Sequence, residues 1–243
     1  MTESIDYYSD PLVNISQNDP LLHREKLSLK LIQHIYQTGN KVVDIGCGEG
    51  KFLLKLQENG IPAKGCDFSK GYVKKCQSKK LDVIFADTNK SFPYNDKEFD
   101  IVYCGEVLEH MVNPDHFIQE CFRILKEDGH LILTTPNLLA WYNRILMLGG
   151  VQPIPVEYST IDSSVGAGIW KSFKKRMTPV GHIRVFTFDA LRDILKMHGF
   201  TIKTVQSAIF DTGFPKVLWP LEHLFCLRPS MGSNFIALAQ KKK

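Results

Sequence analysis

The sequence predicts an α/β fold in which a mainly parallel, doubly wound sheet is covered by helices on both faces. Short apolar or β-branched runs alternate with segments of helix length, and two of these runs end directly in an aspartate, Asp67 and Asp87. Strands separated by helices require right-handed crossovers, which produce parallel neighbours. At 243 residues, the chain has room for one large domain.

The expected elements follow one another along the chain. A helix begins at Asp19 and Pro20 as N-cap and first-turn residue, and Leu27, Leu31 and Ile35 continue it at four-residue spacing. Thr187 is the expected N-cap of a late helix that ends at Gly199. We expect strands at 41–45, 62–66, 81–86, 99–104, 130–135, 200–209 and 234–239, and further helices at 51–59 and 116–125.

The alternation breaks between residues 136 and 184. A structureless loop of this length is uncommon in a compact domain, so we expect a helical lid at 138–186. In its first part, Leu138, Trp141, Ile145 and Leu148 share one helical stripe, which belongs either to the core or to an apolar wall of a binding site. A second apolar segment at 213–231 has three open roles: packing on the lid, joining two subunits or touching a lipid surface.

Composition excludes several classes of protein. Apolar residues make up 44% and charged residues 23%, which are ordinary globular values, and no apolar run approaches the ~18 residues of a membrane span. The first ten residues show no export signal, and the six cysteines form no CxxC pair. We therefore expect a cytoplasmic protein with reduced cysteines and no transmembrane segment.

The segment that carries most chemistry is VVDIGCGEGKF, residues 42–52. An apolar strand containing Asp44 leads into Gly46, Gly48 and Gly50, and a helix follows. Glycines without side chains let a ligand lie on the backbone, and the first turn of the helix offers unpaired N–H groups. The dinucleotide fingerprint GxGxxG would need glycine at position 51, where the sequence has Lys51, and no phosphate-binding GxxxxGK[ST] motif is present.

At these residues the sequence resembles the class I S-adenosylmethionine (SAM)-dependent methyltransferases, whose first motif is an acidic residue followed by GxGxG. The resemblance covers residues 40–137 by motif and 182–240 by pattern. It implies that this loop binds SAM and its product S-adenosylhomocysteine (SAH) through Asp44, Gly46, Cys47, Gly48 and Gly50.

Two further acids fit the same family. Asp67 lies 17 residues after Gly50, where the family binds the ribose hydroxyls, and Phe68 follows where such enzymes pack an apolar side chain on the adenine. Asp87 with Thr88 matches the loop that meets the adenine amino group. A lone aspartate at the end of a strand is often a helix cap, but two of them converge on the crevice where parallel sheets bind ligands.

The segments FDIVYCGEVLEH (99–110) and FRILKEDGHLILTTPN (122–137) are similar to the branch that includes the ubiquinone-biosynthesis O-methyltransferases, with Gly105 and Glu106 at the cofactor. The resemblance implies a Rossmann-like, seven-stranded sheet in the order 3-2-1-4-5-7-6 with the last strand antiparallel. The expected division of the single domain is an N-terminal arm (1–18), a SAM-binding core (19–137), an acceptor lid (138–186) and the C-terminal part of the sheet (187–240).

The expected reaction is in-line methyl transfer to a small molecule, most simply to a hydroxyl of a glycan, lipid-linked or quinone-type compound. His110 and His182 are the two candidates for a general base, although each also fits a packing role. Acidic side chains near the positive sulfonium are electrostatically favourable, namely Asp44, Glu106 and Glu109. Two alternatives stay open: a non-catalytic SAM-binding or interaction subunit, and an NAD-dependent oxidoreductase.

Other partners and cofactors are not expected. The Asn/Asp-Pro-Pro-aromatic tetrad of amine methyltransferases is replaced by Cys104-Gly105-Glu106-Val107, and no nucleic-acid-binding module is recognisable. No cluster with metal-ligand spacing appears, so we predict no metal. The chain is expected to be a monomer or a homodimer, with peripheral membrane contact left open.

Charge is unevenly placed along the chain. Residues 141–243 hold 14 basic against 6 acidic side chains, while residues 1–140 hold 16 against 20. The basic side chains around the expected lid favour an acceptor with an anionic group, although a solvated outer surface would have the same composition. They are Lys171, Lys174, Lys175, Arg176 and Arg184.

Overall fold

A computed structural model describes residues 21–174, 178–211 and 215–242. These residues form a seven-stranded sheet in the order β3-β2-β1-β4-β5-β7-β6, which confirms the expected order. Strand β7 is antiparallel to both of its neighbours, and the pairs from β3 to β5 are parallel. The strands are β1 Val42–Ile45, β2 Ala63–Asp67, β3 Val83–Phe85, β4 Phe99–Gly105, β5 Leu125–Pro136, β6 Phe200–Ala208 and β7 Asn234–Lys241.

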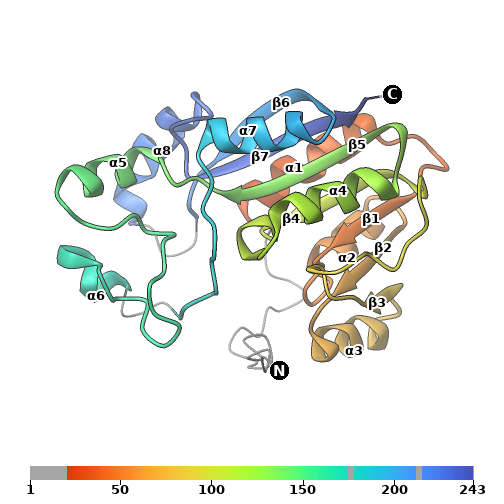
Figure 1. The fold of residues 1–243 in the computed structure, drawn as a ribbon, viewed down its shortest axis with the longest axis horizontal. Helices are drawn as coiled ribbons and strands as arrows, with labels where there is room; N and C mark the ends of the chain where they lie inside the picture. Colours follow the sequence, from red (N-terminus) through yellow and green to blue (C-terminus); the bar gives the residue numbers. More distant parts are fainter. Residues whose placement is uncertain (1–20, 175–177, 212–214, 243) are drawn as a thin grey trace.

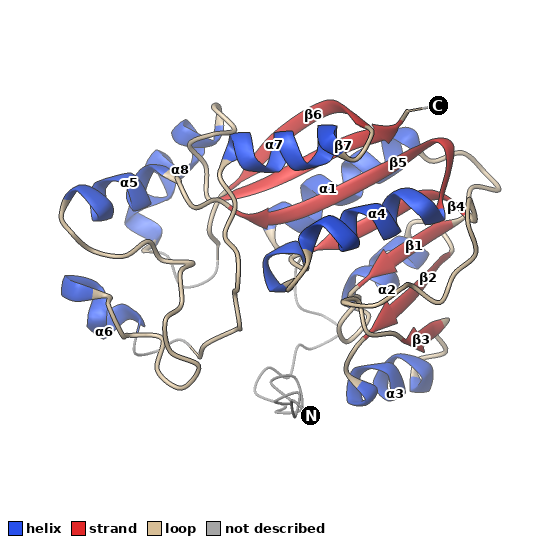
Figure 2. Cartoon of the chain, viewed as in Figure 1, coloured by secondary structure: helices blue, strands red, loops and turns tan. Residues whose placement is uncertain are grey.

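Helices cover both faces of the sheet (Figure 2). One face carries α1 His23–Ile35, α2 Lys51–Glu58 and α3 Lys70–Ser78, and the other carries α4 Pro114–Ile124 and α7 Phe188–Met197. Side chains alternate along each strand, so Val43 belongs to the core under α4 and α7, whereas Val42 belongs to the core under α1 to α3. Two apolar cores therefore hold the sheet between two helical layers.

Helix starts follow the capping signals in the sequence. Thr187 caps α7, because its hydroxyl accepts a hydrogen bond from the Ala190 N–H at 3.2 Å, as predicted. Asn113 caps α4 in the same way, accepting from His116 N–H at 3.1 Å, and Pro114 begins the first turn. The predicted start of the first helix at Asp19 and Pro20 lies outside the described residues.

The segment after β5 contains less helix than a fully helical lid. Its helices are α5 Trp141–Leu148, a short 3-10 turn at Gly168–Trp170 and α6 Lys171–Lys174, joined by turns and irregular chain. Figure 1 shows α5 and α6 beyond the carboxyl end of β5, with α8 (Trp219–Cys226) close to α5. The indole of Trp141 stacks on the ring of Phe225 with centroids 5.1 Å apart.

The predicted stripe on α5 is wrong as a single apolar face. Trp141 is buried, but Ile145 is 61% exposed and Leu148 is 90% exposed. The helix has only two turns, and it packs through Trp141, Tyr142 and Leu146 because α8 lies against that side. The 213–231 segment thus packs partly on α5, while Phe214 lies outside the described residues.

The cysteines and the helix lengths bear on the expected class of protein. All six cysteines are free thiols, and five of them are buried as packing residues. Among the described residues, no helix combines the length and apolar character that crossing a bilayer requires.

Candidate active site

The glycine loop after β1 is built from left-handed backbone. Gly46, Gly48 and Gly50 have φ values of +77°, +54° and +76°, a region that other residues rarely adopt. A Cβ on Gly46 would lie 2.5 Å from Val107 Cγ2, so this glycine allows close packing against the chain after β4. A Cβ on Gly48 would meet nothing within 4 Å. The loop therefore faces open space at Gly48.

Asp67 fixes this loop from the end of β2. Its carboxylate accepts one hydrogen bond from Gly48 N–H at 2.8 Å and another from Ser69 N–H at 2.8 Å. Burial raises the pKa of Asp67, and the two N–H donors act in the opposite direction. Each carboxylate oxygen can accept a second hydrogen bond, so Asp67 is chemically able to bind a ribose diol.

An aromatic surface stands at the ends of β2 and β3. The rings of Phe68 and Phe85 lie 5.9 Å apart, and Phe85 is 45% exposed. The loop beyond them turns through Asp87, whose side chain accepts from Asn89 N–H at 3.1 Å, and Thr88 is buried. Sequence reasoning named Phe68 but missed Phe85, although an aromatic residue two positions before Asp87 was the available signal.

Two of the predicted acids are held in different ways. Asp44 is buried on β1, and its pKa is raised well above the usual range. Burial is the main cause of this rise, and the charge of the nearby Asp67 is the second. Glu106, after Gly105 at the end of β4, has a left-handed φ of +57° and lies 3.6 Å from the Arg24 guanidinium. Its Oε1 accepts from the Thr134 hydroxyl at 2.8 Å. Arg24 therefore balances the charge of Glu106, a pairing that the sequence did not reveal.

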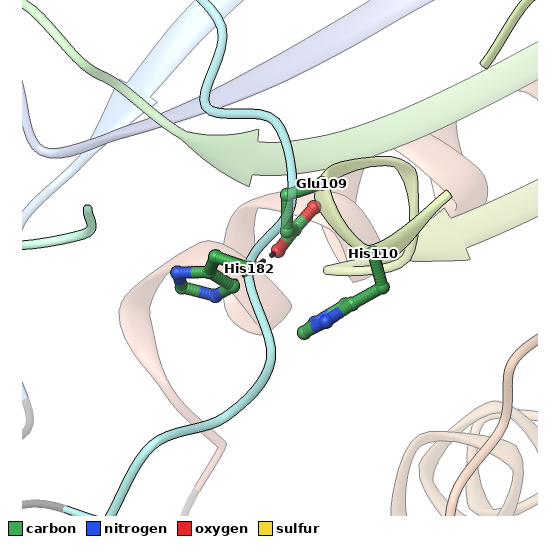
Figure 3. Close-up of side chains that lie close together, drawn as sticks. All are labelled: Glu109, His110 and His182. Carbon is green, nitrogen blue, oxygen red and sulfur yellow. Dashed lines mark ion pairs between the residues drawn. The ribbon is translucent and has the colours of Figure 1, made fainter. Parts of the chain in front are cut away.

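The structure brings His110 and His182 together, although 71 residues separate them in the sequence (Figure 3). Their ring centroids lie 5.0 Å apart, and His182 Nε2 is 4.0 Å from Glu109 Oε1. His110 Nδ1 lies 3.1 Å from Gly181 O, and His182 Nδ1 lies 2.9 Å from Pro155 O. Burial, followed by the neighbouring His182, lowers the pKa of His110 to about 4, so His110 is neutral at pH 7.

His110 and His182 line a cavity of about 330 Å³. Its other lining residues come partly from the chain around the sheet and partly from the segment between β5 and α7. Its wall combines groups from the core, such as Glu106 and Arg24, with groups from the segment, such as Lys174 and Glu157. Gly46 packs against Val107, whose neighbour Glu106 lines the cavity, so the glycine loop contacts the chain segment that contributes Glu106 to the cavity. Further lining residues are Pro136, Tyr142, Ile154, Pro155, Ser163, Thr178, Val180, Phe210, Ser233 and Asn234.

The predicted basic cluster is only partly at this cavity. Lys174 lines it and is 3% exposed, whereas Lys171 is exposed to solvent. Arg184 donates to Val112 O at 3.0 Å. Lys175 and Arg176 lie outside the described residues.

Comparison with known proteins agrees with this geometry. The profile of a family described as "Methyltransferase domain" matches residues 21–205, which is more than half of the chain. The chain belongs to this methyltransferase family. The resemblance to class I SAM-dependent methyltransferases is therefore confirmed.

Several curated relatives of this methyltransferase-family chain are named ubiquinone biosynthesis O-methyltransferases. A ubiquinone biosynthesis O-methyltransferase of Glaesserella parasuis is 35% identical over 121 residues, or 46% of this chain and 51% of that protein. The chain spans about half the length of the curated relatives it matches.

Solved structures share the fold at low identity. A SAM-dependent methyltransferase of Methanosarcina mazei aligns with a TM-score of 0.61 and 19% identity, covering 87% of this chain and 97% of that one. The [4+2]-cyclase SpnF aligns with a TM-score of 0.58 and 20% identity, covering 90% and 80%. Because a protein named as a cyclase shares the fold, the fold alone does not decide the reaction of this methyltransferase-family member.

Proposed function

We propose that this chain is an enzyme that transfers a methyl group from SAM to a hydroxyl group of a small-molecule acceptor. The observation that carries the proposal is one contact: the glycine loop, open at Gly48 and tied to Asp67, packs on Val107, the residue next to Glu106 in the wall of the histidine cavity. Cofactor and acceptor would then meet at the carboxyl ends of β1 and β4, where open α/β sheets bind their ligands.

On the cofactor side, the chain's residues bind and orient. Asp67 would accept hydrogen bonds from the ribose hydroxyls, and Phe68 with Phe85 would cover a face of the adenine. When bound, SAM supplies a methyl group attached to a positively charged sulfur. The leaving group is SAH, in which this sulfur is a neutral thioether. Holding an acceptor in line with that carbon is worth on the order of 7–11 kcal/mol.

On the acceptor side, the hydroxyl must lose a proton as the new O–C bond forms. A neutral imidazole facing the cavity can accept it, and a base of this kind contributes about 10²–10⁴-fold. His110 and His182 both line the cavity, and Lys174, which lines the same cavity, favours an acceptor with an anionic group. Glycan, lipid-linked and quinone-type hydroxyl compounds remain the proposed classes.

The decisive experiment has two steps on the full chain. Calorimetry with SAM, SAH and NAD should show binding of SAM and SAH and none of NAD; NAD binding without SAH binding would overturn the proposal in favour of an oxidoreductase. Labelled SAM should then transfer its methyl group to a member of a panel of hydroxylated acceptors. SAH binding without transfer to any hydroxylated or amine acceptor would instead support a non-catalytic SAM-binding subunit.

A further inference from the structure

Asn234 has a buried side-chain amide nitrogen that the protein leaves without a partner. The residue begins β7 and lines the acceptor cavity, the space of about 330 Å³ that His110 and His182 also line. It is 4% exposed, and its Nδ2 has no hydrogen-bond partner within the described part of the chain. A buried N–H group without a partner is costly. Since the last torsion of an asparagine is broad, the amide can turn its N–H groups toward a ligand in the cavity.

The sheet places Asn234 beside the start of α1. Side chains alternate along a strand, and Ile236, two residues further along β7, belongs to the core under α1 to α3. The Asn234 side chain therefore lies on the face that carries α1. There, Ile209 N–H donates to Nδ1 of His23, the first residue of α1, at 3.2 Å, and Ala208 before it pairs with Asn234. The first turn of α1 and the start of β7 thus meet at one corner of the cavity.

Arg24, the residue after His23, brings a guanidinium to this corner. It lines the cavity, its side chain is 18% exposed, and its Nε lies 3.6 Å from Glu106 Oε2. Neither of its terminal nitrogens has a hydrogen-bond partner among residues 21–174, 178–211 and 215–242. A guanidinium carries five N–H groups in a planar fork, so the contact with Glu106 leaves most of these donors for a ligand.

The two glutamates of the cavity lining have donors of their own. Glu106 Oε1 accepts from the Thr134 hydroxyl at 2.8 Å. The Glu157 carboxylate accepts from the backbone N–H groups of residues 180–182, at 2.8–3.2 Å. These bonds satisfy part of the negative charge that faces the cavity. Arg24 and Asn234, in contrast, have N–H donors left over.

The unpaired donors at this corner define the ligand group that fits it. An ammonium group would add donors and leave those of Arg24 and Asn234 unpaired. A carboxylate or a phosphate offers acceptor oxygens, and its negative charge matches the guanidinium, whose fork binds either group through two parallel hydrogen bonds. The amide N–H of Asn234 can donate to a further lone pair of the same group. The corner therefore suits an oxyanion.

We propose that Arg24 and Asn234 bind an oxyanion group of the methyl acceptor and so determine which acceptors the cavity takes. The role of this group as part of an acceptor rests on the proposed function, whereas its binding at the corner does not. A site with polar groups that need a partner discriminates against analogues that lack one, because the site's own groups then stay unpaired. Neutral compounds of the same shape should therefore bind more weakly. SAH also carries a carboxylate, and the experiment below distinguishes this second source of an oxyanion.

Small aromatic anions test the corner on the full chain without any methyl transfer. Benzoate and phenyl phosphate carry an oxyanion, benzamide is their neutral counterpart, and each is titrated with and without SAH in calorimetry. The wild type should bind at least one of the anions more than about tenfold tighter than benzamide. Arg24→Gln and Asn234→Leu should each lose most of this preference.

Two controls accompany these variants. Arg192→Gln removes the same charge from α7, where Arg192 pairs with Asp189, and should keep the anion preference. Asn234→Leu removes a buried amide nitrogen without a partner, so its unfolding temperature should not fall below that of the wild type. Thermal unfolding of every variant therefore separates lost binding from lost folding.

The outcomes separate the two proposals. Equal affinities of the wild type for the anions and for benzamide would overturn the oxyanion corner, even if methyl transfer is found, and so would an anion preference that both variants keep. If both variants lose affinity for SAH and keep it for 5′-methylthioadenosine, which lacks the carboxylate, the corner binds the cofactor and the inference is again overturned. An anion preference that both variants lose, in a chain that binds no SAH, would leave the corner standing and contradict the proposed methyl transfer.

Discussion

The carboxylate of Asp67 accepts a hydrogen bond from the backbone N–H of Gly48 at 2.8 Å, so the end of β2 holds the glycine loop in place. The same carboxylate is the proposed ribose acceptor. The side chain that holds the glycine loop in place is therefore also the one proposed to bind the ribose.

Asp67→Ala should weaken SAH binding by about 1.5–3 kcal/mol, the range for hydrogen bonds to a charged group. Wild-type affinity should also fall as the pH is lowered, and it should begin to fall above the usual aspartate range, because burial raises the pKa of Asp67. Calorimetry across pH measures both effects. Ser69→Ala is the matched control, since it removes only the cap of α3 and should lower stability by about 1 kcal/mol without changing SAH affinity. An unchanged SAH affinity in Asp67→Ala would remove Asp67 from the cofactor site.

Gly48→Ala should separate cofactor binding from folding. The added methyl group would enter the open space that the cofactor is proposed to fill, and the left-handed φ adds backbone strain of roughly 1 kcal/mol. Gly60→Ala has the same kind of strain, with φ of +73° and nothing within 4 Å of the added Cβ, but it lies away from the loop. Both variants should lose similar thermal stability, and only Gly48→Ala should lose SAH affinity. Equal SAH affinities would show that no ligand lies over Gly48.

The fold was largely readable from the sequence because local signals coincide with the elements. Apolar runs gave the strands, and Thr187 gave the start of α7. The stripe on α5 failed because the side of a two-turn helix that is buried depends on its partner, and α8 comes from a segment about 75 residues later. Such a contact leaves no periodic signal in the helix itself.

Only those residues of the candidate site that lie close together in the sequence could be predicted to act together. The glycines and Asp67 are recognisable within one βαβ unit, whose spacing is fixed by the fold. His110 and His182 were named separately, and their meeting with Glu109 was not foreseen, because the sequence between residues 151 and 186 has no repeating apolar pattern that predicts its path. Hydrogen bonds from residues 183 and 184 to Glu109 O determine that path in the structure.

Trp141→Phe should destabilise the protein through a hydrogen bond more than through lost area. Trp141 Nε1–H donates to the carboxylate of Glu222, which is 0% exposed. Without that donor the buried carboxylate is left less satisfied, and the expected loss is about 1–3 kcal/mol in denaturant unfolding. Trp219→Phe is the matched control, because Trp219 Nε1 has no hydrogen-bond partner within the described part of the chain. Equal losses for the two variants would contradict the role of the Trp141–Glu222 bond.

Burial of the Lys174 ammonium is expected to lower the free energy of unfolding. Its side chain is 3% exposed, its ammonium donates to Val156 O at 3.3 Å, and burial lowers its pKa. Lys174→Met should therefore raise the free energy of unfolding by about 1 kcal/mol or more. Between its lowered native pKa and the ordinary value of 10.5, the unfolded chain binds more protons, so wild-type stability should rise with pH in that window. The rise should be smaller in Lys174→Met, as unfolding curves at several alkaline pH values would show.

A cost of this kind persists where the charge serves a ligand, and Lys174 lines the proposed acceptor cavity. With an anionic acceptor identified by the methyl-transfer screen, Lys174→Met should raise the acceptor KM and leave SAH affinity unchanged, and added salt should raise the wild-type KM. Lys171→Met changes an exposed lysine of the same short helix and should alter neither KM nor stability. A more stable Lys174→Met protein with an unchanged KM would show that the acceptor does not use this charge. The acceptor would then be sought among neutral hydroxyl compounds, which would contact the apolar side chains Tyr142 and Ile154 in the wall of the same cavity.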